Sequence, residues 1–292
     1  MNKDILNLQD SINYNDEFQS LRSNSKKVSK FYTEITAYNE LGEQVWKPKH
    51  NELIIPGGLF VLQKIANVNT PISIQTINED LKINSASSSQ EYFYGNKGLR
   101  RDDVIFGFCV GTDGCGDVFD TVNPVYYKER RIQSIIPFRR VLSSERYKVN
   151  RNSVKYFLPK ATGNYYEYYV KGFETDPVIK VEYDETGYPS VTKSEIDNEN
   201  INSTRVINTY VQFTLKISVN DLREYFETGY GNLKKCRINT LSLVYGYPDG
   251  KDTGDNNADI YRAVRCFSKI NFNNEPFDNT SKELTIIYKI YI

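Results

Sequence analysis

The chain offers few side chains for acid–base or nucleophilic chemistry. Its single histidine, His50, stands in the basic, proline-containing segment Lys47-Pro-Lys-His50, which predicts a surface turn. No Ser/His/Asp or Cys/His combination can be built without that imidazole. The carboxylates are too numerous and too unpatterned to nominate the acid–base pair of a glycoside hydrolase. We therefore predict a protein that is not an enzyme and has no catalytic or cofactor-binding residues.

The cysteines are Cys109, Cys115, Cys236 and Cys266. The first two bracket Val-Gly-Thr-Asp-Gly, a wider spacing than that of zinc knuckles, and the other two are dispersed. A four-cysteine zinc site remains an alternative, and an intracellular setting disfavours a disulfide. We expect reduced cysteines at buried strand ends and no structural metal.

Three glycine-containing segments could in principle bind ions. Pro56-Gly-Gly58 precedes a predicted helix but lacks the Lys-Ser/Thr of a phosphate-binding loop. Residues 111–117 offer Asp113 and Asp117, two carboxylates that are few for calcium, so an exposed, flexible structural turn is favoured. Residues 247–257 are rich in acids but do not follow the order of a calcium loop, which favours a mobile loop.

Basic residues alternate with aromatic ones over residues 123–140. Such a pattern can line a nucleic-acid groove. The surrounding acids cancel the positive field, so a solvated strand face or the rim of a protein interface is the alternative. The basic residues concerned are Lys128, Arg130, Arg131, Arg139 and Arg140.

Composition sets the broad class. Lys and Arg number 37 and so do Asp and Glu, which leaves a net charge of zero and no general attraction to nucleic acid or anionic membranes. Aromatic residues make up 13% of the chain and include 23 tyrosines, which favour strands and protein interfaces. No apolar run approaches the length of a membrane span, and the first residues lack the pattern of a signal peptide, so we expect no membrane partner and synthesis in a cytoplasm.

The elements that would position these residues are mainly strands. A capping box, Ser218 with Asp221, opens a helix predicted to end at Gly229, and apolar spacing predicts another helix over 58–67 and a helical turn within 70–84. An extended passage is predicted over 123–136. Alternation or apolar density predicts strands at 31–38, 43–46, 103–110, 154–158, 165–173, 178–183, 205–217, 236–245, 259–270 and 282–292.

The last of these strands has the clearest pattern. One face carries Leu284, Ile286, Tyr288, Ile290 and Ile292, and the other carries Thr285, Lys289 and Tyr291. A chain end frays unless something holds it, so we expect this strand to insert between other strands or between subunits.

The predicted architecture is mainly β, a sandwich or distorted barrel with two or three short helices. Residues 1–30 are polar and predict an N-terminal arm, whereas 31–292 predict a single β-rich domain with a possible insertion at 184–204. The arm and the loop at 247–257 are expected to be ordered by assembly.

The order of several segments resembles a structural protein of large, Twort-like, contractile-tailed bacteriophages. The resemblance spans roughly residues 30–292 and includes no catalytic signature. It rests on Pro56-Gly-Gly-Leu-Phe-Val-Leu-Gln-Lys, Ile105-Phe-Gly-Phe-Cys-Val-Gly-Thr-Asp-Gly-Cys-Gly, Tyr127-Lys-Glu-Arg-Arg-Ile, Ile136-Pro-Phe-Arg and Ile287-Tyr-Lys-Ile-Tyr-Ile.

The resemblance implies a virion component in the neck, where homo-oligomeric rings join the portal or adaptor to the tail terminator and can contact packaged DNA. Capsid decoration, tail completion and the baseplate are alternative positions in the particle. A carbohydrate-binding adhesin, using exposed tyrosines and Trp46, is the alternative from another class.

Overall fold

The computed structural model describes residues 32–68, 76–83, 102–116, 121–126, 128–184, 206–232, 236–277 and 282–291. Within these ranges, short apolar-rich segments form strands and three segments form α-helices. The strands are β1 (Tyr32–Asn39), β2 (Gln44–Leu53), β3 (Val104–Gly111), β4 (Ile135–Ile136), β5 (Arg139–Leu142), β6 (Tyr156–Thr162), β7 (Tyr165–Gly172), β8 (Val178–Asp184), β9 (Val206–Ser218), β10 (Arg237–Asp252), β11 (Ala258–Cys266), β12 (Ser268–Pro276) and β13 (Glu283–Tyr291). The helices are α2 (Ile55–Ala66), α3 (Ile77–Asp80) and α6 (Val219–Tyr230), with 3₁₀ segments η2 (Ser143–Arg151) and η4 (Thr253–Asp255).

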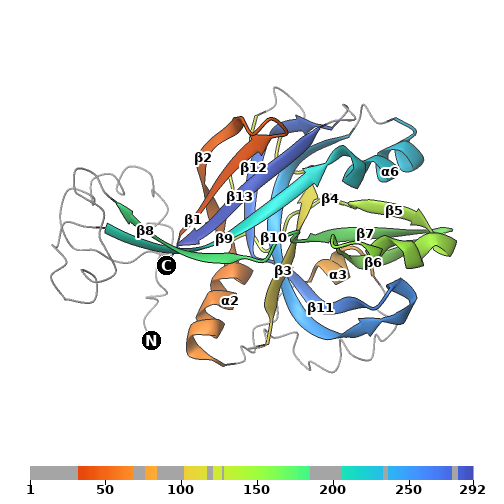
Figure 1. The fold of residues 1–292 in the computed structure, drawn as a ribbon, viewed down its shortest axis with the longest axis horizontal. Helices are drawn as coiled ribbons and strands as arrows, with labels where there is room; N and C mark the ends of the chain where they lie inside the picture. The colour runs from red at the N-terminus through yellow and green to blue at the C-terminus, as the bar shows by residue number, and fades with distance from the viewer. Residues whose placement is uncertain are drawn as a thin grey trace, which may run out of the picture.

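The strands form two antiparallel sheets. The first sheet runs β2-β1-β13-β9-β8, and the second runs β12-β10-β3-β7-β5, with β11, β4 and β6 attached to it (Figure 1). A short ladder between β12 and β2 joins the sheets through Ser268 opposite Leu53 and Lys269 opposite Glu52. The prediction of a mainly β fold is confirmed. Because β5 and β8 end the strand order without pairing to each other, the molecule is an open sandwich rather than a barrel.

The strand β13 lies in the middle of the first sheet. It pairs with β1 from Leu284 to Tyr291 and with β9 from Glu283 to Tyr291. Leu284, Ile286, Tyr288 and Ile290 are buried, and the residues between them are partly exposed as far as Lys289. The predicted insertion of this strand between other strands is therefore confirmed.

The main core lies between the two sheets. Tyr288 and Phe213 of the first sheet belong to the same buried cluster as Phe108 and Leu243 of the second. A second cluster that includes Phe106 and Val244 covers the opposite face of the second sheet. Both faces of β10 and β3 are buried as a result, and this explains why their sequences are densely apolar rather than alternating.

Helix α2 begins earlier than the sequence predicts. Pro56 occupies the first turn, where its missing N–H leaves no helical hydrogen bond unmade, and the N–H of Gly58 donates to Ile54. Pro56-Gly-Gly58 is thus part of the helix rather than a turn before it. Phe60 anchors the helix against the rings of Tyr245 and Phe267, at centroid distances of 4.7 and 5.8 Å.

Helix α6 begins at the predicted capping box. The Asp221 carboxylate accepts hydrogen bonds from the N–H of Ser218 at 2.7 Å and from its hydroxyl at 3.0 Å. The helix ends at Tyr230 and not at Gly229 as predicted, and Gly231 is its C-cap, with the left-handed φ of 63°.

Asp221 also holds α6 to the second sheet. The Tyr156 hydroxyl donates to Asp221 Oδ1 at 2.6 Å, and the Lys171 ammonium lies 3.0 Å from Oδ2. Both side chains of the Lys171–Asp221 ion pair are only 4% exposed. Burial, and then the adjacent carboxylate, raise the pKa of the Tyr156 phenol well above its usual range, so it remains a hydrogen-bond donor at neutral pH.

Several predictions lie outside the described residues. These are the N-terminal arm 1–30, nearly all of the possible insertion 184–204, and Asp117. The helical turn predicted within 70–84 is confirmed by α3. Of the extended passage predicted over 123–136, only β4 forms a strand within the described residues.

Candidate functional site

The structure places His50 within β2, where it stands opposite Glu34 of β1. The predicted turn is wrong because β2 continues to Leu53 and its pairing with β1 extends to Asn51. Among the described residues, no group of three or more His, Cys, Asp or Glu side chains is arranged to hold a metal ion.

All four cysteines are buried, as predicted, and each is a free thiol. Cys109 on β3 and Cys266 on β11 flank β10, where they stand opposite Ser242 and Val244. Cys115 donates its thiol to the Phe272 carbonyl at 3.0 Å. Burial raises the pKa of the Cys109 thiol well above its usual range, which disfavours the thiolate that binds metals.

The glycine-rich segment after β3 is a packed turn. Asp113 is not an exposed carboxylate, because its Oδ2 lies 3.0 Å from the Lys269 ammonium and accepts the Gln133 N–H at 3.0 Å. Lys269 also pairs with Glu129 at 2.9 Å, so one buried ammonium ties this turn and the segment before β4 to β12. These contacts support a structural role rather than cation binding.

Gly114 in this turn should not tolerate a side chain. Its N–H donates to Asn239 Oδ1 at 2.6 Å, and a Cβ would collide with the Asn239 backbone oxygen. We expect Gly114→Ala to lower the free energy of unfolding by ~1–3 kcal/mol because of this overpacking. Denaturant unfolding followed through Trp46, the single tryptophan, measures the change.

The matched control is Gly116→Ala, because a Cβ there meets only the Thr121 backbone oxygen at 4.0 Å. Equal stability of the two variants would contradict the close packing at Gly114.

The segment 247–257 is a β-hairpin rather than the predicted loop. Strand β10 continues to Asp252 and pairs with β11, and η4 forms the connection. The acids are engaged in the fold: Asp252 pairs with Arg146, Asp249 with Arg262, and the buried Asp255 accepts from Asn150 at 2.8 Å. These ionic contacts explain the order of a polar segment and account for the carboxylates that resembled a calcium loop.

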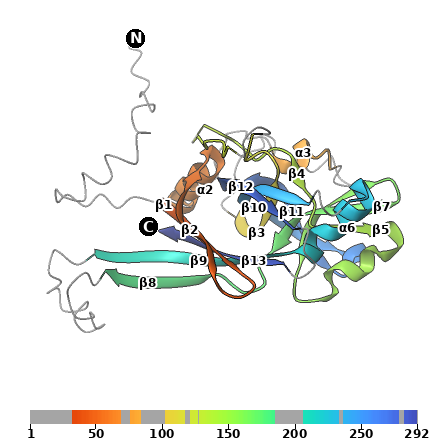
Figure 2. The ribbon, with the colours of Figure 1, turned by 90° about the horizontal axis from the view of Figure 1, so that it is seen from above.

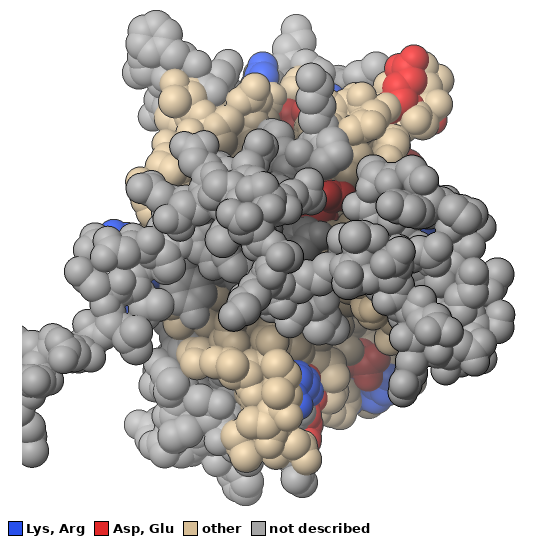
Figure 3. Space-filling model, turned by 90° about the vertical axis from the view of Figure 1, so that its left-hand side faces the viewer, with Lys and Arg blue, Asp and Glu red and all other residues tan. Residues whose placement is uncertain are grey.

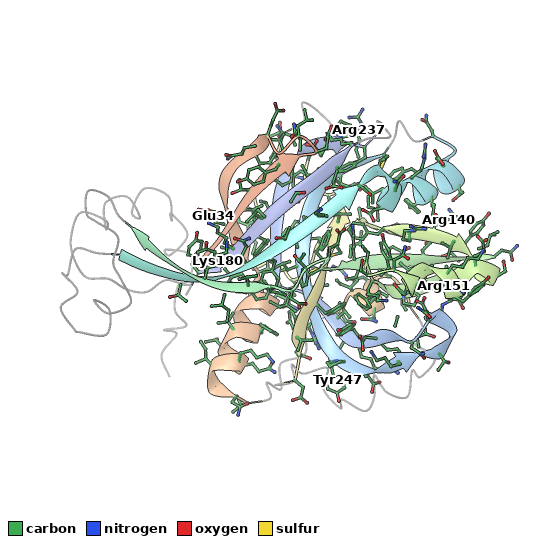
Figure 4. The ribbon with its side chains drawn as sticks, in the orientation of Figure 1. Glu34, Arg140, Arg151, Lys180, Arg237 and Tyr247 are labelled. Atoms are coloured by element: carbon green, nitrogen blue, oxygen red, sulfur yellow. The ribbon has the colours of Figure 1, made fainter. Side chains whose placement is uncertain are left out.

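Three of the five basic residues of the 123–140 segment, Arg131, Arg139 and Arg140, are paired with acids from elsewhere in the chain. Arg131 pairs with Asp80, and Arg139 lies 2.8 Å from Glu224. Farther along, Arg140 and Arg146 lie over the rings of Tyr165 and Tyr166 at 4.5 and 4.4 Å, and so cover the tyrosine-rich start of β7. Figure 4 shows Arg140 and Arg151 together at this end of the molecule. The arrangement favours the interpretation as a solvated or interface surface over a nucleic-acid groove.

The opposite end carries the most distinctive surface, which we call the β8 edge and define as residues 178–184. Strands β8 and β9 project from the sandwich as a two-stranded ribbon (Figure 2). Among the described strands, β8 pairs on one side only, with β9, and ends the first sheet. Val178 is 50% and Ile179 is 77% exposed.

On the face that Figure 3 shows, Lys, Arg, Asp and Glu of the described residues are scattered among uncharged ones. Lys180 on β8 lies at the base of the ribbon, far from Arg140 and Arg151 (Figure 4). A strand that is paired on one side only and carries exposed apolar residues is a template for another strand, which makes the β8 edge the candidate functional site.

Sequence reasoning found the strand at 178–183 but not its position at the end of a sheet. Sheet order depends on pairings between distant segments, and no local signal in the sequence reports them.

Comparison with known proteins adds no identity: no family model, no curated protein and no solved structure matches this chain. Within the part of the chain that the structure describes, no helix is long and apolar enough to cross a membrane.

Proposed function

We propose that this protein is a non-enzymatic structural subunit of a bacteriophage virion, a ring subunit of the neck between portal and tail. The observation that supports this most is the β8 edge, an open, partly apolar strand on a projecting ribbon. Subunits that assemble by adding strands to one another need such an edge. The resemblance to neck proteins of contractile-tailed phages supplies the position in the particle.

The use of charged groups in the fold supports a structural role. Three buried charged side chains hold segments together: Lys269 joins two acids, Asp221 joins α6 to β7, and Asp255 accepts from Asn150 beside the β10–β11 hairpin. In this proposal the partners are further copies of the chain, the portal or adaptor, and the tail terminator.

Electron microscopy tests the proposal in two steps. Negative-stain images of the purified protein at high concentration should contain closed rings, and gold-labelled antibodies against it should bind contractile phage particles at the head–tail junction. Labelling on the capsid or at the tail tip would replace the neck by a decoration or baseplate role. The absence of label from the particles would overturn the virion assignment.

A further inference from the structure

We propose that the β8 edge pairs with the β8 edge of a second copy of this chain, antiparallel and centred on Val181. The pairing makes the first sheets of two subunits continuous. The pairing rests on the proposed function, because it assumes that the chain is an assembly subunit. It deepens that function by naming the partner of the candidate site and the register in which the two strands pair.

The backbone of β8 is suited to accept another strand. Its pairing with β9 is continuous from Val178 opposite Gln212 to Asp184 opposite Val206, with no bulge. Bulges, internal prolines, short length and charged side chains, especially lysine, are common protections of an edge strand against another chain. By contrast with β8, β5 at the other end of the order spans only Arg139–Leu142. The β8 edge is thus the longer of the two ends and has no bulge or internal proline, and its one lysine, Lys180, needs an opposite charge in the partner strand.

The sequence Val178-Ile-Lys-Val-Glu-Tyr-Asp184 is complementary to itself in one register. When Val181 stands opposite its own copy, Lys180 stands opposite Glu182 and Ile179 opposite Tyr183, each twice because of the two-fold axis. Opposite charges and apolar–aromatic pairs directly across an antiparallel ladder are both stabilising.

The neighbouring registers are worse. When a two-fold axis perpendicular to the sheet relates two antiparallel strands, residues that stand opposite each other point to the same face. One residue must then stand opposite its own copy. Each shift of the register moves that central position to the next residue along the strand. One step in one direction places Lys180 opposite Lys180. One step in the other places Lys180 opposite Asp184, but it also places Glu182 opposite Glu182 and shortens the ladder to residues 180–184. Only the register centred on Val181 pairs all seven residues of β8 with no like charges directly opposite each other, which would be destabilising.

A two-fold contact of this kind does not close a polar ring by itself. In the proposed ring, a second and heterologous interface between subunits would therefore be needed to close the circle.

Charge reversal tests the register. The full chain is studied by sedimentation velocity as the wild type, as Lys180→Glu, as Glu182→Lys and as an equimolar mixture of both variants. We expect each single variant to dimerise about tenfold more weakly than the wild type, because both cross-strand pairs become repulsive.

The mixture should recover the wild-type affinity. Lys180→Glu places acids at both 180 and 182, and Glu182→Lys places bases at both positions, so both cross-strand pairs become attractive again in the mixed dimer alone. Recovery also shows that the single variants are folded. A mixture that associates no better than its components would overturn the register centred on Val181.

The matched control is Lys64→Glu, which makes the same charge change at an exposed position of the distant helix α2. It should leave dimerisation unchanged. A loss equal to that of Lys180→Glu would mean that net charge, and not the β8 register, controls association, and would overturn the proposal.

Cysteine cross-linking gives a second measurement. All four native cysteines are buried, so a thiol introduced at the β8 edge is the one that a maleimide should reach first. A short bis-maleimide should join two copies of Val181→Cys efficiently, and two copies of Val178→Cys poorly, because position 178 stands opposite 184. Equal cross-linking of the two variants would contradict the register.

The outcomes separate the two proposals. A monomeric wild type, or single variants that associate as tightly as the wild type, would overturn the β8 pairing even if antibodies label the neck. Charge-rescued dimers from a protein that labels no particle would leave the pairing standing and overturn the virion function.

Discussion

Deleting residues 284–292 should yield insoluble or unfolded protein. The deletion removes nearly all of β13, so β1 and β9 lose their shared partner. It also removes the buried side chains of Leu284, Ile286, Tyr288 and Ile290, each of which stabilises the fold by ~1.5–3 kcal/mol. Even after a discount for a compact unfolded state, their sum rivals the ~5–15 kcal/mol net stability of a typical domain. Soluble expression and thermal unfolding measure the effect.

A pair of point variants makes the same test without deleting the strand. Ile286 is fully buried between the sheets, whereas its neighbour Ile287 is on the other face and only partly buried. Ile286→Ala should cost ~2–5 kcal/mol, and Ile287→Ala less than half of that. A soluble deletion variant with an unchanged melting temperature, or equal costs for the two isoleucines, would show that the position of β13 is misjudged.

The second large effect is expected at Asp221. Asp221→Ala removes the partner of a buried ammonium, the acceptor for the Tyr156 hydroxyl and the reciprocal half of the helix cap. Breaking a buried ion pair costs ~3–5 kcal/mol, and losing a cap about 1 kcal/mol more. Glu174 and the Lys216 carbonyl still contact the Lys171 ammonium, at 3.0 and 2.8 Å, which favours the lower end of this range. Chemical denaturation measures the loss.

Two further variants isolate the cause. Glu227→Ala breaks the exposed Arg223–Glu227 pair on the same helix and should change stability by less than ~0.5 kcal/mol. The double variant Lys171→Met with Asp221→Asn should cost less than the sum of its parts, because it leaves no unpaired charge from this ion pair in the core. Additive costs would mean that Lys171 and Asp221 act independently.

Local patterns predicted the elements whose signals are contained in a few neighbouring residues. The alternation from Leu284 to Ile290 predicted β13, and the Ser218–Asp221 capping box predicted the start of α6. The mainly β class followed from the number of such strands. These predictions succeeded because burial on one face and capping of a helix are decided by spacing along the chain.

The features that the sequence did not predict depend on contacts between distant segments. The sequence Pro248-Asp-Gly250 indicates a turn, yet β10 continues through it because Arg262 and Arg146 pair with the acids of the hairpin. The capping residue Asp221 was found, but its partner Lys171 lies 50 residues away and could not be inferred. The candidate site also depends on contacts between distant segments, since only the strand order shows that β8 ends a sheet.

The order of the strands along the chain limits when the first sheet can form. During translation β1 emerges early, β8 and β9 emerge as a pair much later, and β13 follows all of them. The nascent chain therefore holds two separate strand pairs, each with an apolar face exposed to solvent, until the ribosome has synthesised β13. Pairings over such long separations form slowly and leave an aggregation-prone intermediate, so a chaperone has its longest opportunity to act at this stage.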